Sequence, residues 1–431
     1  MGRKLRYLNM KQKVLAIAAL GLLVTFFVFV IEQNRLHVIS KELRRKYGKE
    51  SSVRHWMVQK YTACNGSFLG FGHQFAVLRN VTLQPNSSKF YIPCDDKRKL
   101  DYSFDYGKEG THLNTWMNNV EIYSRQQYSN SVQKNEVQSV IHQTVNGVLS
   151  DIDLKDKVVV AVQRYESANL YHTMTDWYNV FLVATLLDIP LKNVSVLLSG
   201  GYTKGLLEHT WKSLFTTVFY TDSLSHPLKL PTLVWSVLGY ESPINHHGLE
   251  NMPFLNEFVR FFLGQHSITS TKSLNCDKIV IVFIWRRDYV AHKGNPSGLI
   301  SRKIKNEQEL LDYFRKRNPH AEVSGIQLDL LSFKEQLQVI SNADVLISMH
   351  GAGLTHTLFL PPHAGVIELF TLTWTKYFGL DHFRTMARWK DLQYQAWQNL
   401  NPTNKFPGHY TYVPPSSLYQ LYAGIISKMC P

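Results

Sequence analysis

A run of histidines, glycines and small residues interrupts an apolar stretch at residues 348–369, SMHGAGLTHTLFLPPHAGVIEL. The run begins where the strand-like segment DVLISM ends and a short helical pattern starts. Small residues let the backbone approach a ligand closely, and free N–H groups at a helix start attract phosphate. His350 and His356 flank that start, so both imidazoles are predicted to donate to diphosphate oxygens. The alternative is a tight turn whose imidazoles face solvent.

The spacing of this loop excludes two common phosphate motifs. It does not read G-x-G-x-x-G and carries no Walker A lysine, so neither an NAD site nor a P-loop is predicted. The loop also resembles the HGGG oxyanion loop of hydrolases. That chemistry requires a G-x-S-x-G nucleophile elbow, and the chain contains none.

Two adjacent arginines, Arg286 and Arg287, follow a second strand-like run, KIVIVFIW. Two guanidiniums at the end of a buried strand suit bidentate contacts with a diphosphate. Ligands of open α/β sheets bind at the carboxyl ends of strands, which places these arginines in the same region as the histidine loop. The alternative is a surface ion pair with Asp288 or Glu368.

A third candidate group lies in RYESANLYHTMTD, residues 164–176. A helix starting near Ser167 would place His172 and Asp176 at i and i+4 on one face. A carboxylate and an imidazole on one helix can deprotonate a hydroxyl group, and Glu166 is a second candidate carboxylate. The pair could equally be a structural hydrogen bond.

A metal site is not predicted. Asp151 and Asp153 form a D-x-D pattern, but they precede a strand rather than follow one, and no H-E-x-x-H occurs. Arginines and helix-terminus donors can neutralise a leaving diphosphate without Mg²⁺.

Strand and helix patterns alternate through the part of the chain that carries these candidates. VVVAV at 158–162, a helix through 169–188 and VSVLL at 194–198 form one β–α–β unit, and a second set of alternating elements runs from about residue 278 to 370. Buried strands alternating with helices predict parallel sheets with right-handed crossovers. We therefore predict an α/β protein with two Rossmann-like domains, at 59–270 and 271–410. The last segment, 411–431, is predicted to be a helix that packs back on the first domain.

The N-terminus predicts a membrane anchor. Residues 1–13 are rich in Lys and Arg, and residues 14–31 contain no charge. A helix of that length spans roughly 27 Å, close to the thickness of a bilayer core. We predict a cytosolic tail at 1–13, a transmembrane signal anchor at 14–31 and a stem at 32–58, with the remainder in the lumen. A cleaved signal peptide is the alternative, but no A-x-A site follows the apolar run.

The net charge of the 431-residue chain is +14, and the basic residues are spread along it. No arginine-rich tract, zinc finger or RNP-type motif is present, so a nucleic acid partner is not predicted. A membrane surface or a sugar nucleotide is the partner that this charge favours.

Features of a secreted or lumenal chain accompany the anchor. N-x-S/T sequons predict glycosylation at four positions: Asn65, Asn80, Asn86 and Asn193. The chain has four cysteines, an even number that suits disulfides in an oxidising compartment. We predict the pairs Cys64–Cys94 and Cys276–Cys430 among three possible connectivities.

Several motifs together resemble glycosyltransferase family 61, and within it the xylosyl branch. They are RYESANLYHTMTDWYNVFL, RRDYVAH with SRKI, SNADVLISMHGAGLTH and FRTMARWKDLQYQA, in the expected order over roughly residues 150–395. The related lumenal O-GlcNAc transferases share the HGAGLTH-type loop.

The resemblance implies a GT-B fold, with an acceptor-side first domain and a UDP-sugar-binding second domain facing a cleft. It also implies inversion at the anomeric carbon, no cofactor and no metal. UDP-xylose would be the donor and O2 of the core β-mannose of an N-glycan the acceptor, which indicates a Golgi type II membrane enzyme. The same family's UDP-GlcNAc transferases are one alternative, and a non-catalytic lumenal glycan-binding protein is another.

The resemblance also assigns site residues. Glu368 would bind the ribose hydroxyls, and Asp176 or Glu166, supported by His172, would be the catalytic base. The diphosphate would be held by two arginines and the loop: Arg286, Arg287, His350, Gly351, Ala352, Gly353, Leu354, Thr355 and His356.

Overall fold

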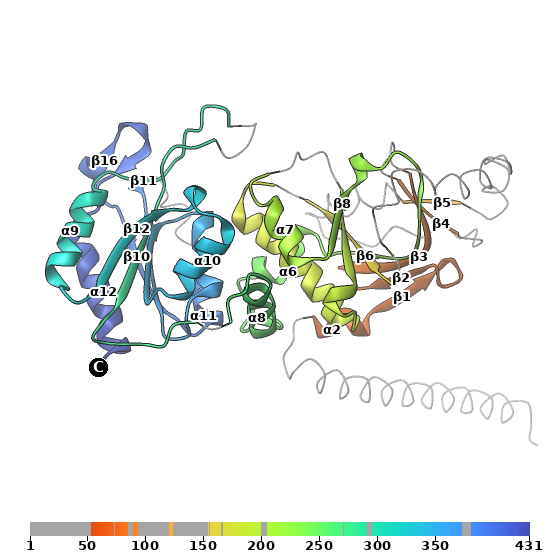
Figure 1. The fold of residues 1–431 in the computed structure, drawn as a ribbon, viewed down its shortest axis with the longest axis horizontal. Coiled ribbons are helices and arrows are strands. Elements are labelled where there is room, and N and C mark those ends of the chain that lie inside the picture. The colour runs from red at the N-terminus through yellow and green to blue at the C-terminus, as the bar shows by residue number, and fades with distance from the viewer. Residues whose placement is uncertain are drawn as a thin grey trace, which may run out of the picture.

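The computed structural model describes residues 53–72, 74–84, 89–93, 120–123, 154, 156–164, 167–199, 205–269, 271–290, 295–372 and 381–431. Two sheets lie side by side with helices between them (Figure 1). The fold is a mixed α/β fold with parallel sheets, as the sequence predicts. The predicted tail, anchor and most of the stem fall outside the described residues. Within the described part of the chain, every helix is too short or too polar to cross a bilayer.

The first domain contains a mixed sheet of nine strands in the order β1-β2-β3-β9-β6-β7-β8, with β4 and β5 continuing from β3. Strands β9, β6, β7 and β8 are parallel, whereas β1, β2, β3 and β4 join antiparallel. The strands are β1 (Lys60–Ala63), β2 (Phe68–Phe71), β3 (Phe75–Gln84), β4 (Lys89–Pro93), β5 (Val120–Tyr123), β6 (Val158–Gln163), β7 (Val194–Ser199), β8 (Thr217–Tyr220) and β9 (Leu228–Trp235).

The antiparallel part corrects the expectation of a simple parallel first domain. Only a short turn joins β2 to β3, and Gly72 in that turn has a φ of +54°. Antiparallel strands can be joined by such a turn, whereas parallel strands need a crossover of a dozen or more residues. Glycine adopts this left-handed conformation at little steric cost.

The second sheet has five strands, all parallel, in the order β12-β10-β13-β14-β15. Its strands are β10 (Val280–Trp285), β12 (Glu322–Gln327), β13 (Val345–Met349), β14 (Gly365–Phe370) and β15 (Gln393–Gln398). The chain runs from β10 to β12 on one side and then crosses to β13 on the other side. The boundary between β10 and β13 is therefore the topological switch point, where ligands of open α/β sheets bind.

The helices of both domains cover the sheets. They are α2 (Arg54–Val58), α6 (Leu170–Leu186), α7 (Glu208–Leu214), α8 (Leu255–Gln265), α9 (Glu307–Arg317), α10 (Phe333–Ser341), α11 (His382–Trp389) and α12 (Pro415–Met429). The segment after β13 forms a 3-10 helix, η9 (Ala352–Phe359), where a short helix is predicted. A small third sheet contains β11 (Lys303–Ile304), β16 (Lys405–Phe406) and β17 (Tyr410–Thr411).

A single apolar core continues from one domain into the other. It includes residues of α6 and α8 of the first domain and of η9, α10 and α11 of the second. Helix α6 is buried around most of its circumference, because the first sheet lies on one side and η9 on the other. A helix that is apolar all round is buried all round. The two domains are therefore joined by direct packing at this core.

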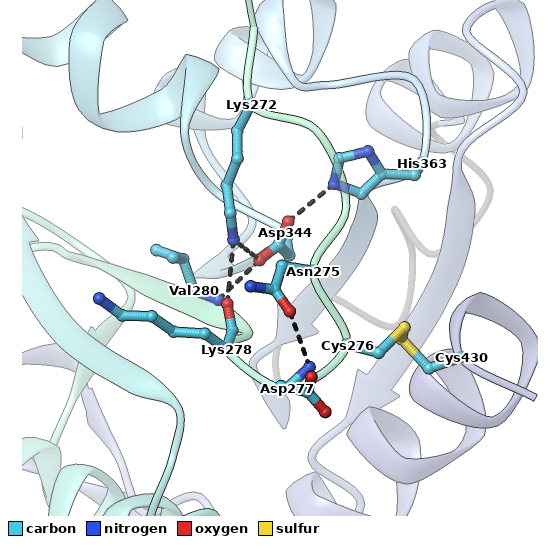
Figure 2. The surroundings of a disulfide bond; sticks show 9 residues. All are labelled: Lys272, Asn275, Cys276, Asp277, Lys278, Val280, Asp344, His363 and Cys430. Carbon is cyan, nitrogen blue, oxygen red and sulfur yellow. Dashed lines mark hydrogen bonds and ion pairs between the residues drawn. A yellow bond between two sulfur atoms is a disulfide. The ribbon is translucent and has the colours of Figure 1, made fainter.

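The C-terminal helix α12 packs on the second domain, and this corrects the prediction that it packs on the first. It contacts β14, β15 and α9. Gly365, the first residue of β14, permits the close approach, because a Cβ there would overlap the side chain of Ile425. The disulfide between Cys276 and Cys430 joins the end of α12 to the loop that precedes β10, as the sequence predicts (Figure 2).

Figure 2 also shows how this loop is held beside the disulfide. The buried carboxylate of Asp344 binds Lys272 Nζ, accepts a hydrogen bond from Val280 N at 2.7 Å and lies 2.7 Å from His363 Nε2. Four segments of the second domain thus meet at one end of the sheet, opposite the switch point.

The remaining predicted modification sites are distributed as follows. Cys64 is disulfide-bonded, and its predicted partner Cys94 lies outside the described residues. Asn65 and Asn80 are exposed and Asn193 is partly exposed, whereas Asn86 lies outside the described residues. Glycosylation of these asparagines stays a prediction.

Candidate active site

Arg286 and the loop after β13 meet at the topological switch point. Arg286 follows β10 directly, and its guanidinium packs on Gly351 so closely that any Cβ at that position would overlap it. Its Nε donates to the carbonyl of Ser301 at 3.0 Å. Burial lowers the pKa of Arg286 from its usual value, yet at neutral pH an arginine stays charged. This places a partly buried positive charge beside the start of η9, which is suitable for a diphosphate.

Three side chains hold His350 at the same end of the sheet. His350 Nδ1 binds Glu368 Oε1, and Tyr394 donates its hydroxyl to Glu368 Oε2 at 2.6 Å. The His350 ring also stacks near Phe370, with centroids 5.3 Å apart. The structure thus shows that Glu368 orients His350. The contact of Glu368 with the ribose hydroxyls stays a prediction.

Arg302 is a member of this site that the sequence analysis did not single out by role. It lies close enough to Arg286 and Glu368 for their charges to interact. Burial is the largest cause, and the charge of Arg286 the second, that lowers the pKa of Arg302 to about 10. Its φ of +62° marks a conformation that non-glycine residues rarely adopt. Arg302 also lines a cavity of about 120 Å³ with Ser301 and Thr371. In the sequence, the basic cluster SRKI that follows the arginine pair is the only indication of a role for Arg302.

Two of the predicted diphosphate ligands lie elsewhere. The side chain of Arg287 is half exposed, and its Nε donates to Glu307 at 3.0 Å. Arg287 thus forms a surface ion pair, the alternative to a diphosphate contact, although its partner is neither Asp288 nor Glu368. His356 is fully buried, with Nε2 at 2.9 Å from Gln336 Oε1, and burial lowers its pKa to about 3. The inward face of η9 takes His356 into the core beside Phe333. These positions correct both predictions.

The other loop residues divide by position. Leu354 and Thr355 are completely buried, so their side chains belong to the core between the domains. Ala352 and Gly353 are partly exposed at the start of η9. A ligand at this loop would meet backbone amides rather than the side chains of Leu354 and Thr355.

The candidate base lies on the first turns of α6. Asn169 caps α6 by accepting a hydrogen bond from Tyr171 N at 2.9 Å, which fixes where the helix begins. His172 is partly exposed, and burial lowers its pKa, so the imidazole is neutral near pH 7. A neutral imidazole can accept a proton.

Asp176, one turn further along α6, is only 1% exposed. Burial raises the pKa of its carboxyl well above the usual value, although Arg164 acts in the opposite direction. Burial therefore disfavours the ionised form of this carboxyl. His172 and Asp176 thus lie one turn apart on α6 as predicted, but His172 is the more exposed of the two. Glu166 lies outside the described residues.

Three side chains that the sequence analysis missed connect the two domains beside this site. His382 Nδ1 lies 3.0 Å from the Tyr171 hydroxyl and 2.8 Å from His247 Nε2. Arg388 on the same helix donates to the carbonyls of His247 and Leu249. The pKa of His382 is lowered to about 4, mainly by burial and to a smaller extent by the charges of three neighbours, His247, His350 and His172. Isolated histidines gave no sequence signal, because their contacts come from separate elements.

The described residues contain no group of three His, Cys, Asp or Glu side chains arranged to hold a metal ion. The candidate site consists of arginines, imidazoles and the backbone at the start of η9. This arrangement can bind an anionic leaving group on the second domain and accept a proton on the first.

Comparison with known proteins adds a family to this geometry. The family model described as Glycosyltransferase 61 matches residues 170–367, which run from α6 into β14. The chain is 29% identical over 269 residues to beta-1,2-xylosyltransferase RCN11 of Oryza sativa subsp. japonica, covering 56% of this chain and 49% of that protein. It is 28% identical over 280 residues to the beta-1,2-xylosyltransferase of Arabidopsis thaliana, covering 56% and 51%.

A relative with another printed activity also matches. The EGF domain-specific O-linked N-acetylglucosamine transferase of Mus musculus is 26% identical over 279 residues, covering 60% of this chain and 49% of that protein. The chain thus spans about half the length of the curated relatives it matches.

Proposed function

Since residues 170–367 form a glycosyltransferase 61 domain, we propose that this protein is an inverting β-1,2-xylosyltransferase that transfers xylose from UDP-xylose to O2 of the core β-mannose of N-glycans. Two β-1,2-xylosyltransferases among its relatives support the donor and the linkage. The observation that carries the transferase chemistry is the packing of Arg286 on Gly351 at the switch point.

The second domain would bind the donor as in a GT-B enzyme. Arg286 and Arg302 would meet the diphosphate oxygens, and the amides at the start of η9 would add hydrogen bonds. His350, which Glu368 orients, would lie beside the same group. These donors are fixed before the reaction, so they stabilise charge on the departing UDP without reorganising.

His172 would be the general base. The acceptor O2 attacks C1 of xylose on the face opposite the diphosphate, and the C1–O bond to UDP breaks with its electron pair. His172 takes the O2 proton as the new glycosidic bond forms. Three observations support His172 over Asp176 as the base. The imidazole of His172 is partly exposed and its pKa is lowered, whereas the carboxyl of Asp176 is buried. No metal is required in this scheme.

The N-terminal sequence supports a location. Residues 1–13 and 14–31 have the charge and length of a cytosolic tail and a signal anchor. We place the protein in the Golgi membrane, single-pass and type II, with both α/β domains in the lumen.

The alternative donor is UDP-GlcNAc, which the match to the EGF domain-specific O-linked N-acetylglucosamine transferase favours. A donor panel with the full chain in EDTA separates the two. Transfer from UDP-xylose to a mannosyl-core N-glycan is expected, with the product linkage read by NMR. Turnover with UDP-GlcNAc alone would reject the xylosyl assignment, and recovery of activity only after Mn²⁺ addition would reject metal independence.

A further inference from the structure

A groove runs beside the last strand of the second sheet, and one of its lining residues, Tyr394, also donates to Glu368 of the candidate active site. It has a volume of about 720 Å³, which lies within the usual range for ligand sites. Its lining comes from α11 and from the adjacent strand β15, including the consecutive residues Tyr394, Gln395 and Ala396. Strand β15 pairs with β14 and with no other described strand.

The consecutive lining residues show that the groove follows the edge of the strand. Successive side chains of a strand point to opposite faces of a sheet. A groove over one face would therefore contact Tyr394 and Ala396 but not Gln395. All three line the groove, so it lies along the edge that β14 does not occupy.

This edge lacks the usual protection against strand addition. Natural edge strands are commonly blocked by lysines, prolines, bulges or inward-pointing charges. Strand β15 reads QYQAWQ and contains no charged residue and no proline. Along its six-residue register with β14 it carries no bulge. Its outer N–H and C=O groups are thus suitable for pairing with another extended chain.

The helix beside the groove indicates the charge of that chain. Arg384 and Arg388 are one turn apart on α11, so both guanidiniums lie on one side of the groove. Asp391 is the one carboxylate among the lining residues. The Arg384 side chain is 50% exposed, lies 3.4 Å from Asp381 and covers the Tyr394 ring at 5.4 Å. Two guanidiniums against one lining carboxylate favour acidic side chains in the occupant.

We propose that the groove binds an extended acidic polypeptide, which pairs with β15 as a sixth strand beneath Arg384 and Arg388. Main-chain hydrogen bonds to β15 would supply affinity, and acidic residues at alternate positions would face α11. This is an interaction surface for a polypeptide, separate from any sugar donor. Its occupation requires neither UDP nor transfer, so its failure and the failure of the proposed function are distinguishable.

The test is a direct binding measurement on the full chain. The probe is a fluorescein-labelled peptide of about eight alternating Glu and Thr residues, a usual strand length. Fluorescence anisotropy is expected to show saturable binding that saturating UDP does not displace. An alternating Lys and Thr peptide is expected not to bind. The Glu peptide carrying N-methyl groups on alternate residues keeps its charge but loses one hydrogen-bonding edge, so at least a tenfold loss of affinity is expected.

Matched variants locate the site. Arg384→Glu is expected to weaken binding of the Glu peptide by at least tenfold. Arg315→Glu on α9 is the control, because Arg315 is also about half exposed and also pairs with an aspartate three residues earlier. It should change affinity less than twofold. A thermal melt of each variant confirms that the fold is intact.

Three results would overturn the proposal. They are equal binding of the peptide to wild type and Arg384→Glu, undiminished binding of the N-methylated peptide, or no binding of the Glu peptide at millimolar concentration. Pairing of two copies through β15 is the competing use of this edge. A dimer in analytical ultracentrifugation that Gln395→Glu dissociates, and that the peptide does not, would assign the edge to self-association instead.

Discussion

The guanidinium of Arg286 rests directly on the backbone of Gly351, and there is no room for a side chain between them. The two residues follow neighbouring parallel strands, β10 and β13, at the switch point of the second sheet. The contact explains why glycine occupies this position although its backbone is extended, a conformation that any residue can adopt. The glycine is required for space rather than for its φ angle.

Gly351→Ala is therefore expected to displace Arg286 and to weaken UDP binding by at least tenfold, equivalent to about 1.4 kcal/mol. Isothermal titration with UDP measures the effect. Gly424→Ala is the control, because a Cβ at Gly424 in α12 meets only open space. That variant should bind UDP normally and gain up to about 1 kcal/mol of stability. Equal UDP affinity in both variants would show that Arg286 does not hold the diphosphate.

The disulfide between Cys276 and Cys430 closes a loop of 154 residues around the second domain. Removing it with a Cys276→Ser and Cys430→Ser double variant is expected to cost roughly 2–5 kcal/mol, because the unfolded chain gains conformational freedom. Urea denaturation followed by tryptophan fluorescence measures the loss. Since α12 packs on β14 and β15, hydrogen exchange should increase first in α12. Unchanged stability would mean that the packing of α12 alone holds the C-terminus.

Buried histidines predict that the protein loses stability in acid. The pKa of His382 is lowered to about 4, whereas in the unfolded chain it is near 6.5. Above pH 6.5 both states are neutral, and the folded state carries no penalty. As pH falls from 6.5 to 4, the unfolded chain binds a proton that the folded protein does not, so the free energy of unfolding decreases. Fully buried His356, with a pKa of about 3, acts in the same direction.

Urea denaturation at pH 7.5, 6, 5 and 4 tests this prediction. His382→Gln removes one titrating group from the interface with Tyr171 and His247. The free energy of unfolding of this variant is therefore expected to decrease less steeply with falling pH than that of wild type. The exposed His320 serves as the control, and His320→Gln should follow the wild-type slope. A wild-type slope retained by His382→Gln would show that protonation of His382 does not contribute.

The sequence predicted the elements whose pattern is local and missed the contacts that require the assembled fold. Apolar runs such as VIVFIW and VLISM predicted β10 and β13, and the glycines after β13 predicted a site at that end. The direction in which the His356 side chain points could not be predicted, because it depends on the 3-10 geometry of η9, whereas the sequence pattern indicated only a short helix. His382, His247 and Tyr171 come from three separate elements, and only packing of the two domains brings them together.

The relation between His172 and Asp176 provides the last prediction. Asp176 is buried, and burial disfavours its ionised form, so Asp176→Asn places a neutral group of similar shape where a charge is already disfavoured. Its transfer rate is expected to stay within tenfold of wild type, a change of less than about 1.4 kcal/mol in the barrier. His172→Gln removes the proposed base and is expected to lower kcat by a factor of at least 100 while leaving UDP affinity unchanged.

Single-turnover kinetics with UDP-xylose, together with UDP titration of both variants, separate the two residues. Loss of activity in Asp176→Asn with full activity in His172→Gln would reverse the assignment and make the buried carboxyl the base. In that case the cleft would have to open at α6 during the reaction, since the carboxyl is only 1% exposed. Hydrogen exchange of α6 with UDP bound would then have to increase, whereas a base at His172 requires no such change.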